Sequence, residues 1–187
     1  MIPRNESDEN LMVQLQEGDR RPMELLVRRY SNPLLTFITR MTGDRHQGED
    51  LFQEVFLTVW TKRAQFNPTR PFRPWLYTIA MNKCRAAYRR RSAPHRAIAV
   101  EPHTMDQKAD SGPSPVDTVI ATETETLVQA AVLQLPEQQR SVFVMRTFNG
   151  LSYGEIGQTL NKNPATARSL MHYALASLRR ELQPHLQ

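Results

Sequence analysis

The chain has 187 residues, enough for one ordinary domain or two small ones, and its 24 basic and 19 acidic side chains give a net charge of +5. A single cysteine excludes an intramolecular disulfide and a cysteine-rich metal site. No run approaches the roughly 18 apolar residues that cross a bilayer, and the first residues are polar and acidic. We therefore expect a cytoplasmic protein that is neither secreted nor inserted in a membrane.

Charge is distributed unevenly along the chain. Residues 1–61 hold seven basic and ten acidic side chains, whereas residues 62–96 hold ten basic side chains and no acidic one. Residues 97–126 reverse the sign with one lysine and six acids, and residues 127–187 return to six basic and three acidic side chains. A local excess of cations without neighbouring acids is typical of a surface that meets a polyanion such as a nucleic acid.

Apolar residues recur at spacings of three and four through most of the chain, and glycine is scarce, so the sequence predicts an all-α fold. The first long helical pattern covers residues 23–41 and contains Asn32 and Pro33. Because proline disfavours helical backbone at the residue before it, we expect the helix to be interrupted there.

The next pattern, over residues 49–60, has two distinct sides. Its apolar stripe, which we expect to face a core, consists of Phe52, Phe56, Val59 and Trp60. The displayed side consists of Asp50, Gln53, Glu54 and Leu57. One side therefore packs, and the other is available to a partner.

Residues 72–91 combine aromatic and basic side chains without an acid. The side expected to pack consists of Phe72, Trp75, Leu76, Ile79 and Ala80. A polar stripe follows at helical spacing, made of Thr78, Asn82, Arg85 and Arg89. Aromatic rings beside a basic track suit unstacked bases, so we favour single-stranded DNA as the ligand. The alternative is that Trp75 and Tyr77 are simply core residues.

Residues 93–117 lack periodicity and hold four prolines among scattered acids, which is typical of a linker. Helical spacing resumes after this segment. The sequence therefore predicts two helical domains, residues 1–96 and 118–187, joined by a flexible acidic linker over residues 97–117.

Residues 151–182 contain the signals of a short helix, a tight turn and a long helix. Ser152 and Glu155 form a capping box at the start of the short helix. Asn161 suits the left-handed conformation that ends a helix, and Asn163 followed by Pro164 suits the start of the next one. This pattern predicts a helix-turn-helix, although an αα-hairpin that merely packs would carry the same caps.

The second helix of this motif has an apolar stripe and a polar face. The stripe consists of Ala167, Leu170, Met171, Ala174, Leu175 and Leu178. The polar face consists of Thr166, Arg168, Ser169, His172 and Tyr173. In a helix-turn-helix the second helix enters the major groove, so these side chains are candidates for base contacts, with Arg168 suited to a bidentate contact with guanine.

Four segments in order, "GEDLFQEVFLTVW", "PFRPWLYTIAMN", "RRR" and "LPEQQRSVFVMRTFNGLSYGEIGQTL", resemble the extracytoplasmic-function sigma factors of bacteria. The resemblance covers nearly the full chain except the linker. It implies a non-catalytic subunit that joins core RNA polymerase, recognises two promoter elements and helps to melt the duplex. It also implies that the acidic linker threads a basic channel of the polymerase, and that an anti-sigma factor is a candidate partner.

The resemblance assigns roles to the displayed residues. Those that would contact core polymerase are Asp50, Gln53, Glu54 and Leu57. Those that would bind the minus-ten element, with residues 66–74 holding a flipped base, are Phe72, Arg73, Trp75, Asn82, Arg85 and Arg89. Those that would read the duplex minus-thirty-five element are Thr166, Arg168, Ser169, His172 and Tyr173.

Two other functions are considered. A metalloenzyme would need His46, Asp50 and Glu54 to share one ion. These residues lie on three successive helical turns, which is a long span for one ion, and no second cluster completes a site, so we expect no metal, cofactor or catalytic residue. Lys83 and Arg85 flank Cys84 and could lower the pKa of its thiol, but the sequence suggests no catalytic partner. The stronger rival is a stand-alone helix-turn-helix regulator that binds operator duplexes as a dimer without polymerase.

Overall fold

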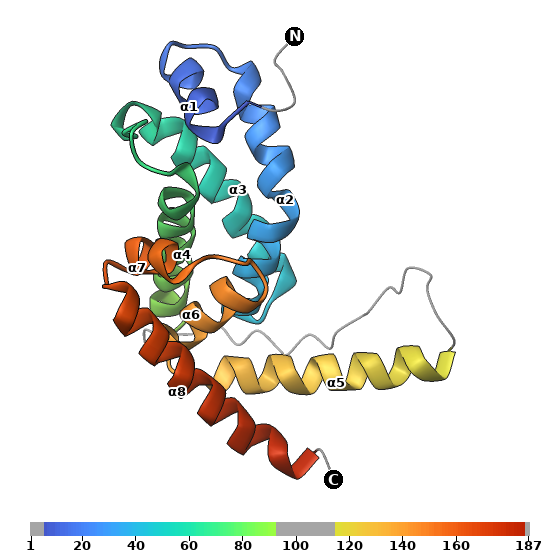
Figure 1. The fold of residues 1–187 in the computed structure, drawn as a ribbon. Coiled ribbons are helices and arrows are strands. Elements are labelled where there is room, and N and C mark those ends of the chain that lie inside the picture. The colour runs from blue at the N-terminus through green and yellow to red at the C-terminus, as the bar shows by residue number, and fades with distance from the viewer. Residues whose placement is uncertain (1–5, 93–114, 186–187) are drawn as a thin grey trace.

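The computed structural model describes residues 6–92 and 115–185, and every regular element in these ranges is a helix (Figure 1). The elements are α1 (Asp8–Gln16), α2 (Arg21–Thr42), α3 (Arg45–Lys62), the short 3-10 helix η1 (Arg63–Gln65), α4 (Phe72–Ser92), α5 (Pro115–Gln134), α6 (Glu137–Thr147), α7 (Tyr153–Leu160), α8 (Pro164–Leu182) and the 3-10 helix η2 (Gln183–His185). The predicted all-α class is confirmed. None of the described helices is both long and apolar enough to span a bilayer.

Helix α2 runs unbroken through Pro33, so the expected interruption at Asn32 and Pro33 is wrong. The buried side chains on either side of the proline include Leu26, Tyr30, Leu34 and Phe37. A proline inside a helix costs about 3 kcal/mol, and burying one large apolar side chain returns about 1.5–3 kcal/mol. Packing on both sides of Pro33 therefore keeps α2 continuous.

Helix α3 packs through a stripe that differs from the predicted one. Phe56 and Val59 are buried as expected, but the rest of the buried stripe comes from Leu51 and Val55. Phe52 and Trp60 are only half-buried at its edges. The buried stripe is therefore rotated around the helix from the predicted one, onto the side that contacts α2 and α4.

The helix-turn-helix of the C-terminal half forms as its caps predict. The Ser152 hydroxyl accepts a hydrogen bond from the Glu155 amide at 3.2 Å, and the Glu155 carboxylate accepts one from the Ser152 amide at 2.8 Å. Asn161 ends α7 in the left-handed conformation at φ 53°, and the Asn163 side chain caps α8 with Pro164 in its first turn.

A close approach at Gly157 sets the distance between α7 and the start of α8. A Cβ atom at this position would lie 2.7 Å from the carbonyl oxygen of Lys162 and 3.4 Å from the nitrogen of Pro164. Both neighbours are backbone atoms of the turn, which cannot move aside as a flexible side chain can. Only glycine lets the two helices meet at this distance.

The apolar stripe of α8 forms as predicted except at Leu175. Ala167, Ala174 and Leu178 are buried, but Leu175 is 49% exposed. Leu175 lies about 100° around the helix from Ala174, and α8 projects beyond the helices it packs against (Figure 1).

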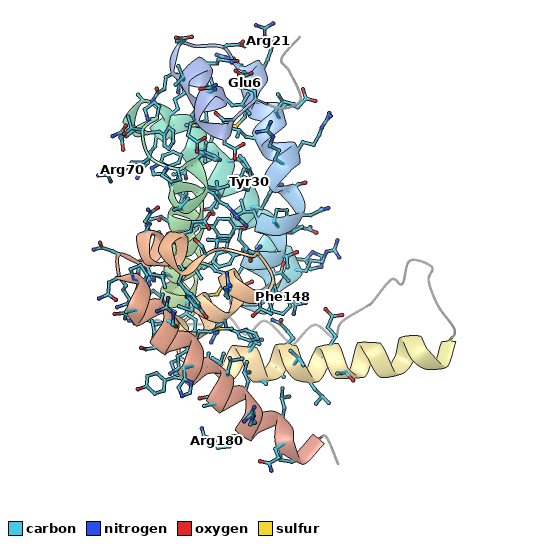
Figure 2. The ribbon with its side chains drawn as sticks, in the orientation of Figure 1. Glu6, Arg21, Tyr30, Arg70, Phe148 and Arg180 are labelled. Atoms are coloured by element: carbon cyan, nitrogen blue, oxygen red, sulfur yellow. The ribbon has the colours of Figure 1, made fainter. Side chains whose placement is uncertain are left out.

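The two halves pack on one another and share a continuous apolar core. The Asn149 side chain, buried in the loop between α6 and α7, donates to the Pro33 carbonyl of α2 at 2.6 Å. Arg140 of α6 donates to the Met41 carbonyl near the end of α2 at 3.0 Å. The Arg40 guanidinium of α2 lies 3.9 Å from the ring centroid of Phe148, which Figure 2 shows where α2 meets the C-terminal half.

Most of the predicted linker, residues 97–114, lies outside the described residues. Residues 115–117, which the same prediction included, already belong to α5.

The two glycines of α7 make a matched test of the turn. Gly157→Ala should lower the free energy of unfolding by about 1–3 kcal/mol, because the added methyl group must push the turn backbone away. Gly154→Ala should leave it unchanged or raise it by up to about 1 kcal/mol, because its Cβ would make only an ordinary contact at 3.7 Å with Ser152. Urea unfolding of both variants measures the difference. Equal effects of the two substitutions on the free energy of unfolding would show that the turn does not require glycine at position 157.

Candidate nucleic-acid interface

Helix α4 begins at an aromatic cluster that fixes the loop before it. The Phe72 amide donates to the Glu9 carboxylate at 2.8 Å, and the Phe72 ring lies 5.6 Å from Tyr30, 5.8 Å from Phe66 and 5.9 Å from Trp75 between ring centroids. Phe72 is fully buried in this cluster. In this conformation its ring has no surface to offer to a base, so its place is in the core that supports the loop.

Trp75 stays half-buried at the edge of the same cluster, with its ring centroid 5.1 Å from that of Phe66. The preceding loop carries a local turn in which Asn67 accepts hydrogen bonds from the amide and the hydroxyl of Thr69 at 3.0 and 2.8 Å. Arg70 of this loop is exposed and points away from the body (Figure 2). A partly open aromatic edge therefore lies beside an ordered loop that displays a cation.

Three cations of α4 have carboxylate partners from other helices. Lys83 meets Glu54 of α3 at 2.8 Å, Arg85 meets Glu137 of α6 at 2.6 Å, and Arg73 lies 3.6 Å from Glu155 of α7. Arg73 also donates to the carbonyl of Asn149. The C-terminal half thus covers part of the predicted DNA face, including Arg73 and Arg85.

Thr78 and Met81 extend this covered strip along α4. The Thr78 hydroxyl donates to the Pro74 carbonyl at 2.8 Å and lies 3.3 Å from the carbonyl of Thr159 in α7. The hydroxyl of Ser141 lies 3.4 Å from the Met81 sulfur. Side chains of α6 and α7 therefore contact one strip of α4 along much of its length.

The far end of α4 stays open. Asn82 and Arg89 are exposed, as the sequence predicts for this stripe, and so is Arg90. Tyr88 is 65% exposed and lies three residues beyond Arg85. The sequence reasoning did not select Tyr88, although its spacing from Arg85 continues the polar stripe with an aromatic ring.

The displayed side of α3 is largely as predicted. Asp50, Gln53 and Leu57 are exposed, Leu57 to 64%, which is unusual for a large apolar side chain. Glu54 is half-buried and engaged with Lys83. The part of this surface that remains for a partner is therefore one acid and one amide beside an exposed leucine.

Most of the polar face of α8 is open to solvent. Arg168, Ser169, His172 and Tyr173 are exposed, and Thr166 is half-buried at the first turn. The rings of His172 and Tyr173 form an edge contact at 5.9 Å. The Arg168 guanidinium lies 5.3 Å from the ring centroid of Tyr153 at the start of α7, a contact that the sequence reasoning missed.

Cys84 lies on the packed side of α4. It is buried, and burial raises the pKa of its thiol to about 12, which outweighs any effect of the neighbouring Lys83 and Arg85. The idea that these cations activate the thiol is therefore wrong, because their side chains point to carboxylates of other helices. Among the described residues, no three His, Cys, Asp or Glu side chains gather closely enough to hold a metal ion.

Comparison with known proteins matches the two halves separately. A family model described as sigma-70 region 2 matches residues 26–93, and one described as sigma-70 region 4 matches residues 125–178. The RNA polymerase sigma-H factor of Pseudomonas aeruginosa is 31% identical over 97% of this chain and 97% of its own length. The ECF RNA polymerase sigma factor SigW of Bacillus subtilis is 30% identical over 91% of this chain and 94% of its own.

Two solved structures share the fold. CnrH, solved in complex with the cytosolic domain of CnrY, superposes with a TM-score of 0.74 at 23% identity and covers 96% of this chain and 99% of its own. RpoE from Bartonella quintana, solved with the anti-sigma factor NepR, superposes with a TM-score of 0.65 at 20% identity. The match covers 86% of this chain and 96% of the RpoE chain.

The buried thiol predicts a specific loss of stability at alkaline pH. The folded state keeps the Cys84 proton up to about pH 12, whereas the unfolded chain releases it near 9, so stability is lost as pH rises through this window. Between pH 9 and 10.5 the free energy of unfolding should fall more steeply for the wild type than for Cys84→Ala, by up to about 1.4 kcal/mol per pH unit. Urea titrations at several pH values measure both slopes, and parallel slopes would contradict the buried thiol.

Proposed function

The chain belongs to the extracytoplasmic-function sigma factors, and we propose that it directs RNA polymerase to promoters through three surfaces, on α3, α4 and α8. As a sigma factor it is a transcription initiation factor, not an enzyme in itself, and it binds core RNA polymerase and promoter DNA. Its place of action in this proposal is the cytoplasm, where the polymerase works.

One observation carries the assignment of surfaces. The chain has two separate faces whose side chains suit a nucleic acid, the basic side of α4 and the polar side of α8, and a third exposed patch around Leu57 on α3. A stand-alone regulator needs only the second of these. A factor that must hold polymerase, melt one promoter element and read another needs all three.

The α4 face is assigned to the minus-ten element. Trp75 offers a partly open ring beside the loop over residues 66–71, where an unstacked base would lie, and each stacked base contributes roughly 1–3 kcal/mol. Asn82, Arg85 and Arg89 would follow the backbone of the strand, and Tyr88 joins them as a second stacking surface. Phe72 supports the loop from the core.

The α8 face is assigned to the minus-thirty-five element. Helix-turn-helix proteins place the N-terminal part of the second helix in the major groove, and here that part displays Arg168, Ser169 and His172. A bidentate contact between an arginine and guanine contributes about 1–3 kcal/mol of discrimination. Thr166 and Tyr173 lie at the two ends of this surface.

DNA binding at α4 requires the two halves to separate. Arg85 directs its Nε–H to Glu137, and Arg73 is engaged with Asn149 and Glu155, so DNA can use both guanidinium groups fully only when these contacts open. Exchange of carboxylate for phosphate replaces one charge-assisted contact by another, so the exchange itself has a modest energetic cost. RpoE is found with an anti-sigma factor, and a partner of this kind for the present chain is part of the proposal.

A run-off transcription assay with purified core RNA polymerase tests this function. Genomic promoter fragments are transcribed with core alone, with the chain alone and with both. Discrete new transcripts that need both components are expected, and alignment of their upstream sequences gives the two promoter elements. Absence of transcripts, together with nanomolar binding of the chain alone to a palindromic duplex, would contradict the proposal in favour of a stand-alone regulator.

The α3 surface is tested by replacing two of its exposed residues with arginine. Asp50→Arg with Leu57→Arg should weaken binding to core polymerase on the order of tenfold or more, because both side chains are displayed and neither belongs to the buried stripe. Glu54 is left in place because it pairs with Lys83. Fluorescence anisotropy of the labelled chain against core polymerase gives the dissociation constants.

The matched control for this experiment adds the same charge elsewhere. Asn10→Arg with Glu17→Arg changes the net charge by the same amount at exposed positions of α1 and its C-cap. This control should bind core polymerase like the wild type. Equal affinity of the two double variants would remove the α3 surface from the interface.

A further inference from the structure

A cluster of two guanidinium groups and one aromatic ring lies at the edge of the helix-turn-helix. Arg146 of α6 lies 5.0 Å from the ring centroid of Tyr153, the first residue of α7, and Arg168 of α8 lies 5.3 Å from the same centroid. Both distances fall within the roughly 6 Å range of cation–π attraction. Three helices that meet in this region each contribute one member (Figure 1).

Tyr153 is held in place before any DNA binds. It follows Ser152 directly, and the capping box between Ser152 and Glu155 fixes the backbone at this point. Its side chain is half-buried and packs against the apolar core. Arg146 is fixed as well, since it donates to the Leu151 carbonyl at 3.0 Å.

Arg168 is the member of the cluster that lies on the helix face proposed to meet DNA, and its behaviour decides what the cluster does. A long exposed arginine samples many rotamers, and ordering it on a base opposes binding. Contact with a fixed ring removes part of that freedom in the unbound protein. It also keeps the guanidinium near the start of α8, on the side that would enter the groove.

We propose that Tyr153 is a positioning residue for base recognition, which holds the Arg168 guanidinium ready for its base pair and so sharpens discrimination at that pair. This inference rests on the proposed function of α8. Tyr153 acts through Arg168 and does not itself contact a base. Arg146 contacts the same ring from α6.

A tyrosine that only packs would behave differently from one that positions an arginine. Loss of packing weakens the whole helix-turn-helix and lowers affinity for every promoter alike. Loss of positioning lowers the preference for the correct base at one position and leaves the other positions unchanged. It also disappears when Arg168 is absent, so the two residues must be energetically coupled.

The experiment uses holoenzyme assembled from core polymerase and the full chain, on a library in which each position of the minus-thirty-five element is varied. The variants are Tyr153→Leu, Tyr153→Phe, Arg168→Ala and the double variant Tyr153→Leu with Arg168→Ala. Arg168→Ala should lose on the order of ten- to hundredfold discrimination at one base pair. Tyr153→Leu should lose about two- to fivefold of the discrimination at that same base pair. Tyr153→Phe should keep the wild-type discrimination, and the double variant should match Arg168→Ala.

The outcomes separate the inference from the function on which it rests. If Arg168→Ala leaves every position unchanged, the assigned role of Arg168 fails. If Arg168→Ala has its expected effect but Tyr153→Leu changes no position, or lowers all positions equally, the positioning role is overturned and the proposed function stands.

A second measurement does not depend on any variant that must fold. In the wild-type protein, nuclear magnetic resonance should show the Arg168 side-chain protons displaced by the ring current of Tyr153, with restricted motion of the Nε–H bond. Arg168 protons at ordinary positions with free motion would overturn the inference.

Discussion

Helix α4 carries cations and no carboxylate of its own, and this constraint organises the molecule. Its partners must come from other elements, and they come from three different ones: Glu54 of α3, Glu137 of α6 and Glu155 of α7. The first pair lies within the N-terminal bundle, between α3 and α4. The other two bring the helix-turn-helix half onto the face that the proposed function assigns to DNA. A single helix without acidic residues of its own therefore pairs with carboxylates from both halves of the molecule.

These ion pairs are partly exposed, and such pairs contribute only about 0.2–1 kcal/mol each. Most of the free energy that joins the halves comes from their shared apolar core and from directed contacts such as Asn149 with Pro33 and Arg140 with Met41. The ion pairs place carboxylates opposite two guanidinium groups that the proposed function assigns to DNA. In that proposal, DNA binding exchanges one anionic partner for another.

Local signals predicted local structure well. The capping box at Ser152, the left-handed Asn161 and the cap at Asn163 act within a few residues, and all three form as predicted. Long-range packing was not predictable in the same way: Pro33 sits inside α2 because residues far along the chain bury both sides of it. Helical spacing placed Phe72 on the packing side, and it is buried against Tyr30 and Phe66, whereas its DNA-binding role came only from the resemblance. Nothing in the spacing of charges indicates that Arg85 meets Glu137, 52 residues away.

The carboxylates opposite Arg73 and Arg85 have a consequence for the response of the protein to ionic strength. Dissolved salt weakens a protein–DNA complex because cations return to the phosphates, by about one power of concentration for each phosphate neutralised. The same salt weakens the pairs with Glu155 and Glu137, which in the proposed function would free Arg73 and Arg85 for DNA. The two effects have opposite signs and act on the same guanidinium groups. Under the proposed assignment of α4 to DNA, the salt dependence of promoter binding should therefore be less steep than the number of contacted phosphates alone would give.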